Sequence, residues 1–271
     1  MDKKFTVLVI GAHPDDCEIK VGGLGIKCVE KGYRVIFMSA TNGETGHQTL
    51  SNEETARIRK GEFERSCNMA GIECFVTDIP SNKILPDIIT REMFVRIIRG
   101  YQPDIIITHR LNDYHPDHRI TAQLVQDTSY AIKVPKVCPD VPPLRYTPAI
   151  LYMSDSFKRP YEFSPHIALD IDAVLDKKMR MLACHESQVY DWLPWVDGVS
   201  DQVPEDKEER YLWMKEDRSS RDKKCADRFR ELLCKRYGEE KGKSIVYAEA
   251  YEVSEYGRQL SFDELDEIFP K

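Results

Sequence analysis

The 271-residue sequence contains no apolar run near the ~18 residues that a membrane-spanning helix requires. An excess of basic residues is also lacking, because 39 Lys and Arg stand against 46 Asp and Glu, for a formal net charge of −7. This balance argues against a dedicated nucleic-acid-binding protein, which needs a basic surface. Charges of both signs are mixed with 41% hydrophobic residues, so the composition indicates a folded chain rather than a disordered one.

The eight cysteines include no Cys-x-x-Cys pair. In a chain long enough to bury its own core, we expect free, buried thiols rather than a disulfide framework. We also expect the apolar stretch 5–12 to be a strand rather than part of a signal peptide, because it is followed by His13 and Pro14 instead of a small-residue cleavage site. These features predict a cytoplasmic protein, for which a homo-oligomer is possible.

The sequence has no internal repeat, but short β-branched apolar runs alternate with segments of helical periodicity. This order is typical of a mostly parallel sheet with helices on both faces. We therefore predict an α/β fold, a Rossmann-like three-layer sandwich. The expected strands are 5–12, 34–40, 73–77 and 104–108, and the expected helices are 18–31, 53–70, 87–101 and 118–132.

The second half of the chain is less regular. The proline-rich stretch 134–148 is expected to be a connection, because strand-like segments follow it directly. Polar residues concentrate around 190–224, where we expect a flexible or lid-like insertion. The whole chain, 1–271, is predicted to be a single domain. Its later elements are expected as strands at 149–153, 167–169 and 244–251 and helices at 171–186 and 222–237.

Titratable residues gather directly after the first and fourth expected strands. The first cluster is HPDDCE at 13–18, and the second runs from His109 to the HPDH segment at 115–118. Ligands of open parallel sheets bind beyond the carboxyl ends of the strands, where the strand order reverses. Strands 1 and 4 usually flank that point, so we expect the two clusters to lie side by side.

Imidazole and carboxylate groups are suitable ligands for a divalent metal. A catalytic zinc ion typically takes three protein ligands and leaves one position for water, whose pKa it lowers to about 7. Two histidines and one carboxylate would supply this set. Another carboxylate would act as general base, and another histidine would stabilise the oxyanion or protonate the leaving group. Spacing alone leaves open which carboxylate and which histidine of the second cluster bind the metal.

Each cluster alone also has a purely structural interpretation. Asp15 suits a helix N-cap with Glu18 at the third helical position, and the HPDH segment suits a polar loop that caps the next helix. The occurrence of both clusters at neighbouring strand ends favours a metal site.

The HPDDxE and HPDH motifs, together with Gly22-Gly23, resemble the LmbE-like, or PIG-L, family of zinc-dependent de-N-acetylases. That family removes acetyl groups from small molecules and glycolipids that contain N-acetylglucosamine. The resemblance implies a hydrolase that acts on an N-acetylated amino sugar or its conjugate. Further segments resemble the family as well: residues 41–44, 59–71, 185–188 and 248–251.

Carried over by motif position, the resemblance implies one zinc ion per chain. Its ligands would be His13, Asp16 and His118. Asp15 would be the general base that deprotonates the attacking water.

The remaining roles concern the substrate. By resemblance, His115 would polarise the carbonyl oxygen and protonate the departing amine, and Asp117 would orient the His115 ring. Arg59 would bind substrate hydroxyl groups. Glu44 would either reach the substrate or anchor its own loop.

Two other functions compete with an N-deacetylase. An amidase that acts on a larger sugar conjugate would use the same site. A non-catalytic, Rossmann-like nucleotide-binding protein is less well supported, because no GxGxxG follows the first strand and Asp15 and Asp16 there would repel a pyrophosphate.

Overall fold

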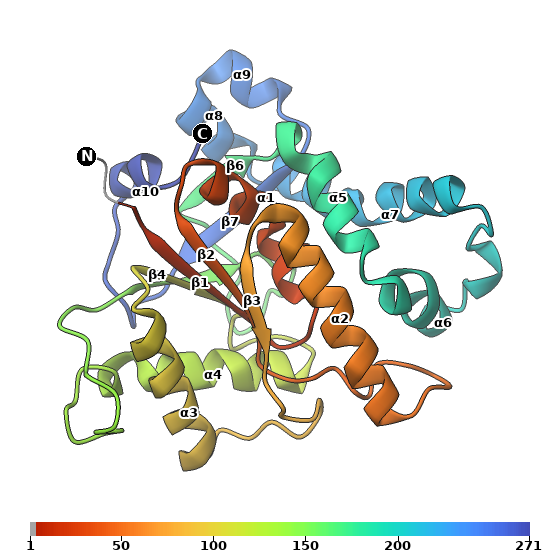
Figure 1. Cartoon of the computed structure of the whole chain (residues 1–271). Coiled ribbons are helices and arrows are strands. Elements are labelled where there is room, and N and C mark those ends of the chain that lie inside the picture. Colours follow the sequence, from red (N-terminus) through yellow and green to blue (C-terminus); the bar gives the residue numbers. More distant parts are fainter. Residues whose placement is uncertain (1–3) are drawn as a thin grey trace.

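The structure is a computed structural model that describes residues 4–271, and these residues form one seven-stranded sheet (Figure 1). The strand order is β3-β2-β1-β4-β5-β7-β6. The predicted α/β fold with a mostly parallel sheet is confirmed. The strands are β1 (Thr6–Gly11), β2 (Arg34–Ser39), β3 (Glu73–Val76), β4 (Ile105–Thr108), β5 (Ala149–Met153), β6 (Ile167–Asp170) and β7 (Ala248–Val253).

Strand β1 occupies the inner part of the sheet and pairs in parallel with both β2 and β4. Leu8 lies opposite Ile36 on one side and Ile106 on the other. Strand β7 alone is antiparallel to its neighbours, β5 and β6. Inner parallel strands are covered on both faces, which explains their continuous apolar runs. The carboxyl ends of β1 and β4 therefore meet at one edge.

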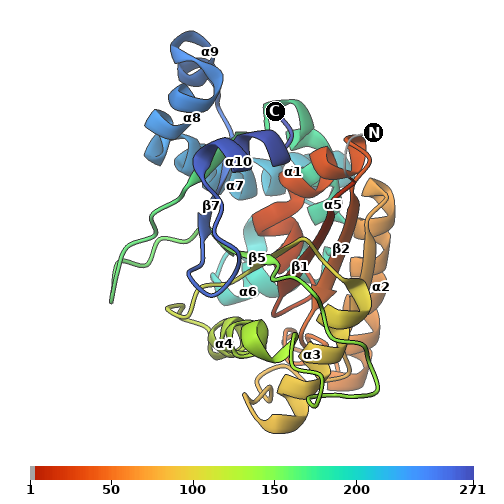
Figure 2. The ribbon, with the colours of Figure 1, turned by 90° about the vertical axis from the view of Figure 1, so that its left-hand side faces the viewer.

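Helices cover both faces of the sheet (Figures 1 and 2). Val7 and Val9 of β1 share a core with α1, α2 and α5, whereas Leu8 and Ile10 share the opposite core with α3 and α4. This division follows from the alternation of side chains along a strand. The helices are α1 (Asp16–Glu30), α2 (Asn52–Ala70), α3 (Ile88–Tyr101), α4 (Pro116–Ala131), α5 (Leu175–Ala183), α6 (Leu193–Val196), α7 (Lys207–Arg228), α8 (Arg230–Tyr237), α9 (Glu239–Ser244) and α10 (Phe262–Ile268).

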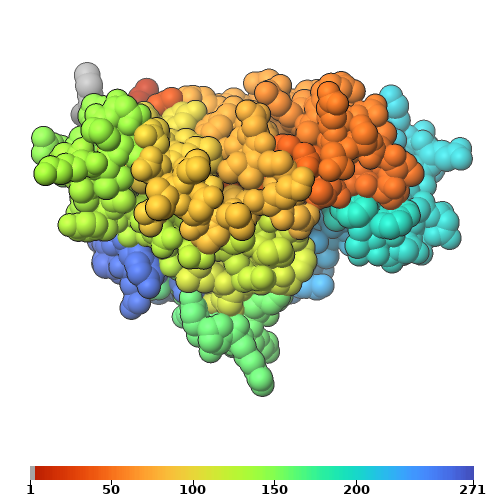
Figure 3. Space-filling model, turned by 90° about the horizontal axis from the view of Figure 1, so that it is seen from below, coloured from red at the N-terminus to blue at the C-terminus, as the bar shows by residue number. Residues whose placement is uncertain are grey.

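The polar segment around 190–224 has more regular structure than we expected of a flexible or lid-like insertion. Its second half belongs to α7, a 22-residue helix that begins after the N-cap Asp206. The helix buries only a narrow stripe that includes Met214 and Ala226, so most of its positions are polar. A stripe this narrow gives a weak apolar periodicity, which is why the sequence did not predict the helix. A different segment, between β5 and β6, projects from the body (Figure 3).

A buried ionic cluster joins α1, α5, α7 and β7. Lys178 Nζ lies 2.8 Å from both carboxylate oxygens of Asp222 and 2.9 Å from Glu249 Oε1. Glu249 also accepts hydrogen bonds from the backbone N–H groups of Gly23 and Leu24, each at 2.8 Å. A side chain at position 23 would collide with its neighbours, because a Cβ atom there would lie 2.5 Å from Ile171 Cγ2 and 3.0 Å from Glu249 Oε1. The cluster thus fixes α1, the helix that follows the first motif.

We expect Lys178→Met to lower the free energy of unfolding by about 3–5 kcal/mol, because it leaves buried carboxylates without their cation. Urea unfolding followed by circular dichroism would measure the change. The matched control is Arg180→Met, two residues along the same helix, where the ion pair with Asp176 is exposed to solvent. A loss for Lys178→Met no larger than that of the control would contradict a structural role for the cluster.

All eight cysteines are free thiols, and five of them are buried. In residues 4–271, none of the helices is both long and apolar enough to cross a membrane.

Candidate metal centre and active site

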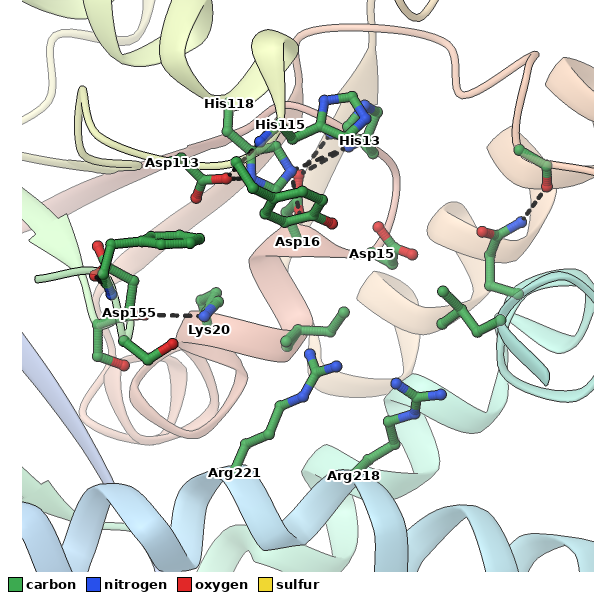
Figure 4. A pocket seen from close by; sticks show the side chains of 18 of the residues that line it. His13, Asp15, Asp16, Lys20, Asp113, His115, His118, Asp155, Arg218 and Arg221 are labelled. Atoms are coloured by element: carbon green, nitrogen blue, oxygen red, sulfur yellow. Dashed lines mark hydrogen bonds and ion pairs between the residues drawn. The ribbon is translucent and has the colours of Figure 1, made fainter. Parts of the chain in front are cut away.

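The two motifs meet at the edge where β1 and β4 end, beside a cavity of about 720 Å³. This volume lies within the ~300–1,000 Å³ range of small-molecule sites. The first motif follows β1 and enters α1, and the second precedes and enters α4. Figure 4 shows His13, His115 and His118 gathered on one side of the cavity, with Asp15 and Asp16 close by.

Three side chains surround a common point. His13 Nδ1 lies 3.5 Å from Asp16 Oδ2, Asp16 Oδ1 lies 3.5 Å from His118 Nε2, and the two nitrogens lie 3.3 Å apart. A tetrahedral zinc ion with bonds of ~2.0–2.2 Å separates its ligand atoms by roughly 3.4 Å. The spacing of these three groups therefore fits one such ion.

A carboxylate lies beside the outer nitrogen of each of these two rings. His13 Nε2 is hydrogen-bonded to Asp117 Oδ2 at 3.0 Å. His118 Nδ1 lies 3.1 Å from Asp113 Oδ1, although this contact is not a well-oriented hydrogen bond. A neutral imidazole that directs its N–H outward presents its lone pair inward. Metal-ligating histidines have this arrangement, in which a carboxylate fixes the tautomer and the ring orientation.

The charges around His13 favour a cation at this position. Burial alone would lower the pKa of His13, but hydrogen bonds with Asp117 and Asp16 raise it to about 9. Burial likewise opposes ionisation of Asp16, but His118 and His109 hold the pKa of this carboxyl well below its usual value. Two backbone N–H groups, of Ala12 and His13, donate to Asp16 Oδ2 and fix its position. A group of buried carboxylates that stabilises a proton also suits a metal ion.

The carboxylate of Asp117 does not contact the ring of His115. Its carboxylate accepts from the Asn82 backbone N–H at 2.8 Å and contacts His13, not His115. His115 is the N-cap of α4, and its Nδ1 accepts from the Asp117 backbone N–H at 3.2 Å. Asp117 therefore meets the His115 ring through its backbone N–H, whereas its side chain turns toward the loop after β1.

We expect Asp117→Ala to weaken metal binding by about 10- to 100-fold, the usual effect of removing a carboxylate that holds a ligating histidine. Competition with a chelator would measure the affinity. Asp127→Ala, on the exposed side of the same helix, is the control. If metal affinity were unchanged and only turnover fell, Asp117 would act by positioning the His115 ring instead of supporting the metal site.

Asp15 is the N-cap residue of α1, but its side chain makes no capping hydrogen bond. The carboxylate lines the cavity, and its Oδ2 lies 3.1 Å from Arg59 Nη2. Burial raises the pKa of Asp15, and the Arg59 charge opposes this shift. The capping interpretation of this motif therefore does not account for Asp15, whose carboxylate is available for chemistry.

The two expected substrate-binding residues differ in position. Arg59 lines the cavity, but it is nearly buried and donates to the Pro14 carbonyl at 2.8 Å in addition to contacting Asp15. Glu44 is not among the residues that line the cavity. Its carboxylate accepts from Asn42 and Asn52 and holds the loop that precedes α2. Of the two roles left open for Glu44, this geometry favours loop anchoring.

Two overlapping groups could hold a metal as well: His13, His115 and His118, or Asp16, His109 and His118. His109 is buried and stacked on His118, with ring centroids 4.1 Å apart. Its Nε2 accepts from the Ala12 backbone N–H at 3.1 Å, so this lone pair already has a partner. His118 belongs to every arrangement.

The sequence reasoning missed Asp113 as a partner of His118 and Asn82 as a partner of Asp117. Asp113 lies inside the second cluster, where an acidic residue near a candidate ligand could have drawn notice. Asn82 contributes only its backbone, for which the sequence offers no signal. His185 is fully buried, and its Nε2 lies 2.9 Å from Glu18 Oε1.

The sequence was compared with known protein families and with curated and solved proteins. Residues 8–129 match the PIG-L family, described as GlcNAc-PI de-N-acetylase. This part of the chain is similar to that family. It includes both motifs, so the predicted resemblance is confirmed.

Among curated relatives, the diacetylchitobiose deacetylase of Thermococcus kodakarensis is 27% identical, over 72% of this chain and 76% of that protein. The 4-oxalmesaconate hydratase of Pseudomonas putida is 23% identical, over 69% of this chain and 75% of that protein. The solved N,N'-diacetylchitobiose deacetylase from Pyrococcus horikoshii has a TM-score of 0.72 at 21% identity and covers 93% of this chain and 84% of that chain. At this identity the structural match supports the fold.

Proposed function

We propose that this protein is a metal-dependent N-deacetylase, with zinc as the metal, that hydrolyses the acetamide of an N-acetylglucosamine-type sugar or its conjugate. The observation that carries the proposal is the placement of an uncapped carboxylate, Asp15, beside the inward-facing ligand atoms of His13, Asp16 and His118 in one cavity. The PIG-L match and the deacetylase relative support the same reaction.

His13, Asp16 and His118 would hold the ion. A divalent ion bound there supplies Lewis acidity, which polarises the substrate carbonyl and makes water a better nucleophile. Asp117 and Asp113 keep the two rings in the orientation that this requires.

Asp15 is the general base. Its raised pKa brings proton affinity closer to the working pH, which is the condition for efficient proton transfer. Arg59, 3.1 Å away, holds the carboxylate in place. Asp15 accepts a proton from the attacking water, whose oxygen bonds to the acetyl carbon. When the C–N bond breaks, the proton passes to the amine nitrogen, and the products are acetate and a free amine.

His115 donates a hydrogen bond to the carbonyl oxygen of the substrate. Because its Nδ1 accepts from the Asp117 backbone, the neutral ring carries its proton on Nε2. Burial and the neighbouring His13 and His118 lower its pKa to about 4, so the ring is neutral near pH 7. A neutral ring of this kind stabilises an oxyanion by hydrogen bonding, while Asp15 carries the proton to the amine.

A second candidate is the hydration of an unsaturated carboxylic acid, the reaction class in the name of the Pseudomonas putida relative. The cationic side chains on the far side of the cavity favour it, because such a substrate is an anion. Hydration adds water to a C=C bond and releases neither acetate nor amine. An amidase that acts on a larger conjugate would use the deacetylase chemistry unchanged.

The deciding experiment is an assay of the zinc-loaded protein for free amine and acetate across a panel of N-acetylated amino sugars and their conjugates. Equal amounts of both products support deacetylation. Amine without acetate from a larger acyl conjugate supports the amidase. No amine from any member of the panel, together with hydration of 4-oxalmesaconate, would overturn the proposal in favour of the hydratase.

A further inference from the structure

Several cationic side chains line the cavity on the side away from the histidines, and one of them, Arg228, is paired with Glu162. Four further ones are Lys20 of α1 and Arg218, Arg221 and Lys224 of α7, here called the cationic wall. Arg218 and Arg221 are about one helical turn apart, and Figure 4 shows both extending from α7 toward the side chains of Asp15 and Asp16. The metal centre and the cationic wall thus face one cavity from opposite sides.

The charges of the cationic wall are poorly compensated within the protein. The side chains of Arg221 and Lys224 form no hydrogen bond or ion pair with any other residue in 4–271. Lys20 Nζ donates to a neutral acceptor, the Ser154 carbonyl, at 2.9 Å. Arg218 Nε lies 3.0 Å from the exposed carboxylate of Asp217, but it has no well-oriented hydrogen bond in the described part of the chain.

Two neighbouring arginines, in contrast, have carboxylate partners. Arg110 forms two hydrogen bonds of 2.6 Å with the Asp155 carboxylate, and Arg228 is paired with Glu162 at 3.0 Å. These two arginines thus have carboxylate partners, which Arg221 and Lys224 of the cationic wall lack.

Holding these cations together costs free energy. Arg218 is only 8% exposed, and burying a charge without a paired counter-charge is unfavourable. Burial and the charge of Arg221 lower the pKa of both Lys20 and Arg218. An anion in the cavity would remove both penalties, because it would replace lost hydration and separate like charges.

We propose that the cationic wall binds an anionic group of the substrate, a carboxylate or a phosphate, and that the substrate is therefore an anionic conjugate of an N-acetylated amino sugar. The acetyl end of this assignment rests on the proposed function. Guanidinium groups bind both anions through paired hydrogen bonds, so the two share one recognition chemistry. Helix α7 lies outside the matched residues 8–129, so the family match alone does not describe this side of the cavity.

Three matched substrates test the proposal in the zinc-loaded protein: N-acetylglucosamine as a neutral methyl glycoside, as its 1-phosphate, and as a glycoside of a hydroxy acid. We expect kcat/KM to be about 10-fold or more higher for at least one anionic compound, since hydrogen bonds to charged groups are worth ~1.5–3 kcal/mol. The phosphate and hydroxy-acid arms distinguish the two anions. Equal kcat/KM for all three compounds would overturn the proposal.

Arg221→Gln should reduce the ratio of anionic to neutral kcat/KM by about 10-fold, mainly through KM, because it removes a charged contact to the anion. Lys223→Gln is the matched control, because Lys223 lies on the same helix but does not line the cavity. If the ratio changed equally in both variants, the preference would come from the net charge of the protein and not from contacts of the cationic wall, and the proposal would fail.

A binding measurement tests the cationic wall independently of the proposed deacetylase activity. Calorimetry compares glucosamine 1-phosphate and the hydroxy-acid glycoside of glucosamine with methyl glucosaminide, and it needs no turnover. If no acetamide is hydrolysed but an anionic compound still binds more tightly, and Arg221→Gln removes that preference, the cationic wall stands and the deacetylase assignment fails. If hydrolysis occurs but the anionic and neutral compounds bind equally, the wall assignment fails alone.

Discussion

Asp15→Asn is expected to lower deacetylase turnover by at least ~100-fold while the protein retains its metal. The substitution keeps the size and hydrogen-bonding shape of the side chain but removes its ability to accept a proton, and general bases contribute 10²- to 10⁴-fold. The side chain makes no capping bond to α1, so its replacement leaves the helix start intact. The loss should therefore appear in kcat rather than in folding.

Metal content and kcat, measured on the same preparation, test this result. Glu44→Gln is the control, because its carboxylate lies in the loop before α2 and does not line the cavity. A control loss comparable to that of Asp15→Asn would show that Glu44 reaches the substrate after all. Full turnover in Asp15→Asn would remove Asp15 from the mechanism, and loss of metal would make it a ligand instead.

The meeting of the two motifs was predictable because it follows from the backbone alone. Buried parallel strands have continuous apolar sequences. Such runs occur at Val7–Ile10 and Ile105–Ile107. Once β1 and β4 are neighbours, the residues that follow them share one edge of the sheet. Helix ends were predictable for the same kind of local reason, as where Gly71 adopts a positive φ of 71° at the end of α2.

Side-chain partners were harder to predict because they depend on rotations about single bonds after the chain has folded. Asp117 is two residues from His115 in sequence, yet its carboxylate contacts His13, from which it is separated by 104 positions. The neighbouring His115 meets only the backbone N–H of Asp117. A carboxylate then lies beside the outer nitrogen of each candidate ligand ring, an arrangement typical of metal-ligating histidines.

The cationic wall was hidden in the sequence for a different reason. Residues 207–228 are read as a charged, solvated segment, because cations and anions alternate along them and few apolar residues interrupt them. Only the packing of α7 against β7 and α5, secured by Lys178, Asp222 and Glu249, turns one side of the helix toward the cavity. Charge has a functional meaning here only once the tertiary position is known.

His118→Ala is expected to abolish stoichiometric metal binding and, with it, deacetylation. His118 Nε2 lies 3.3 Å from His13 Nδ1 and 3.5 Å from Asp16, so its loss leaves two ligands where a catalytic zinc ion needs three. Every alternative grouping of candidate ligands at this edge also includes His118. Its removal should therefore have the largest effect of any single histidine substitution in the protein.

Metal analysis of His118→Ala after dialysis against zinc should show well under one ion per chain, against about one for the unmodified protein. His47→Ala is the control, because His47 does not line the cavity and only supports its own loop. Two further variants identify the remaining ligands. His13→Ala should lose metal as well, whereas His109→Ala should keep it, because the His109 lone pair is engaged by the Ala12 backbone N–H. The opposite pattern, with metal retained in His13→Ala and lost in His109→Ala, would move the ion to the Asp16, His109 and His118 group.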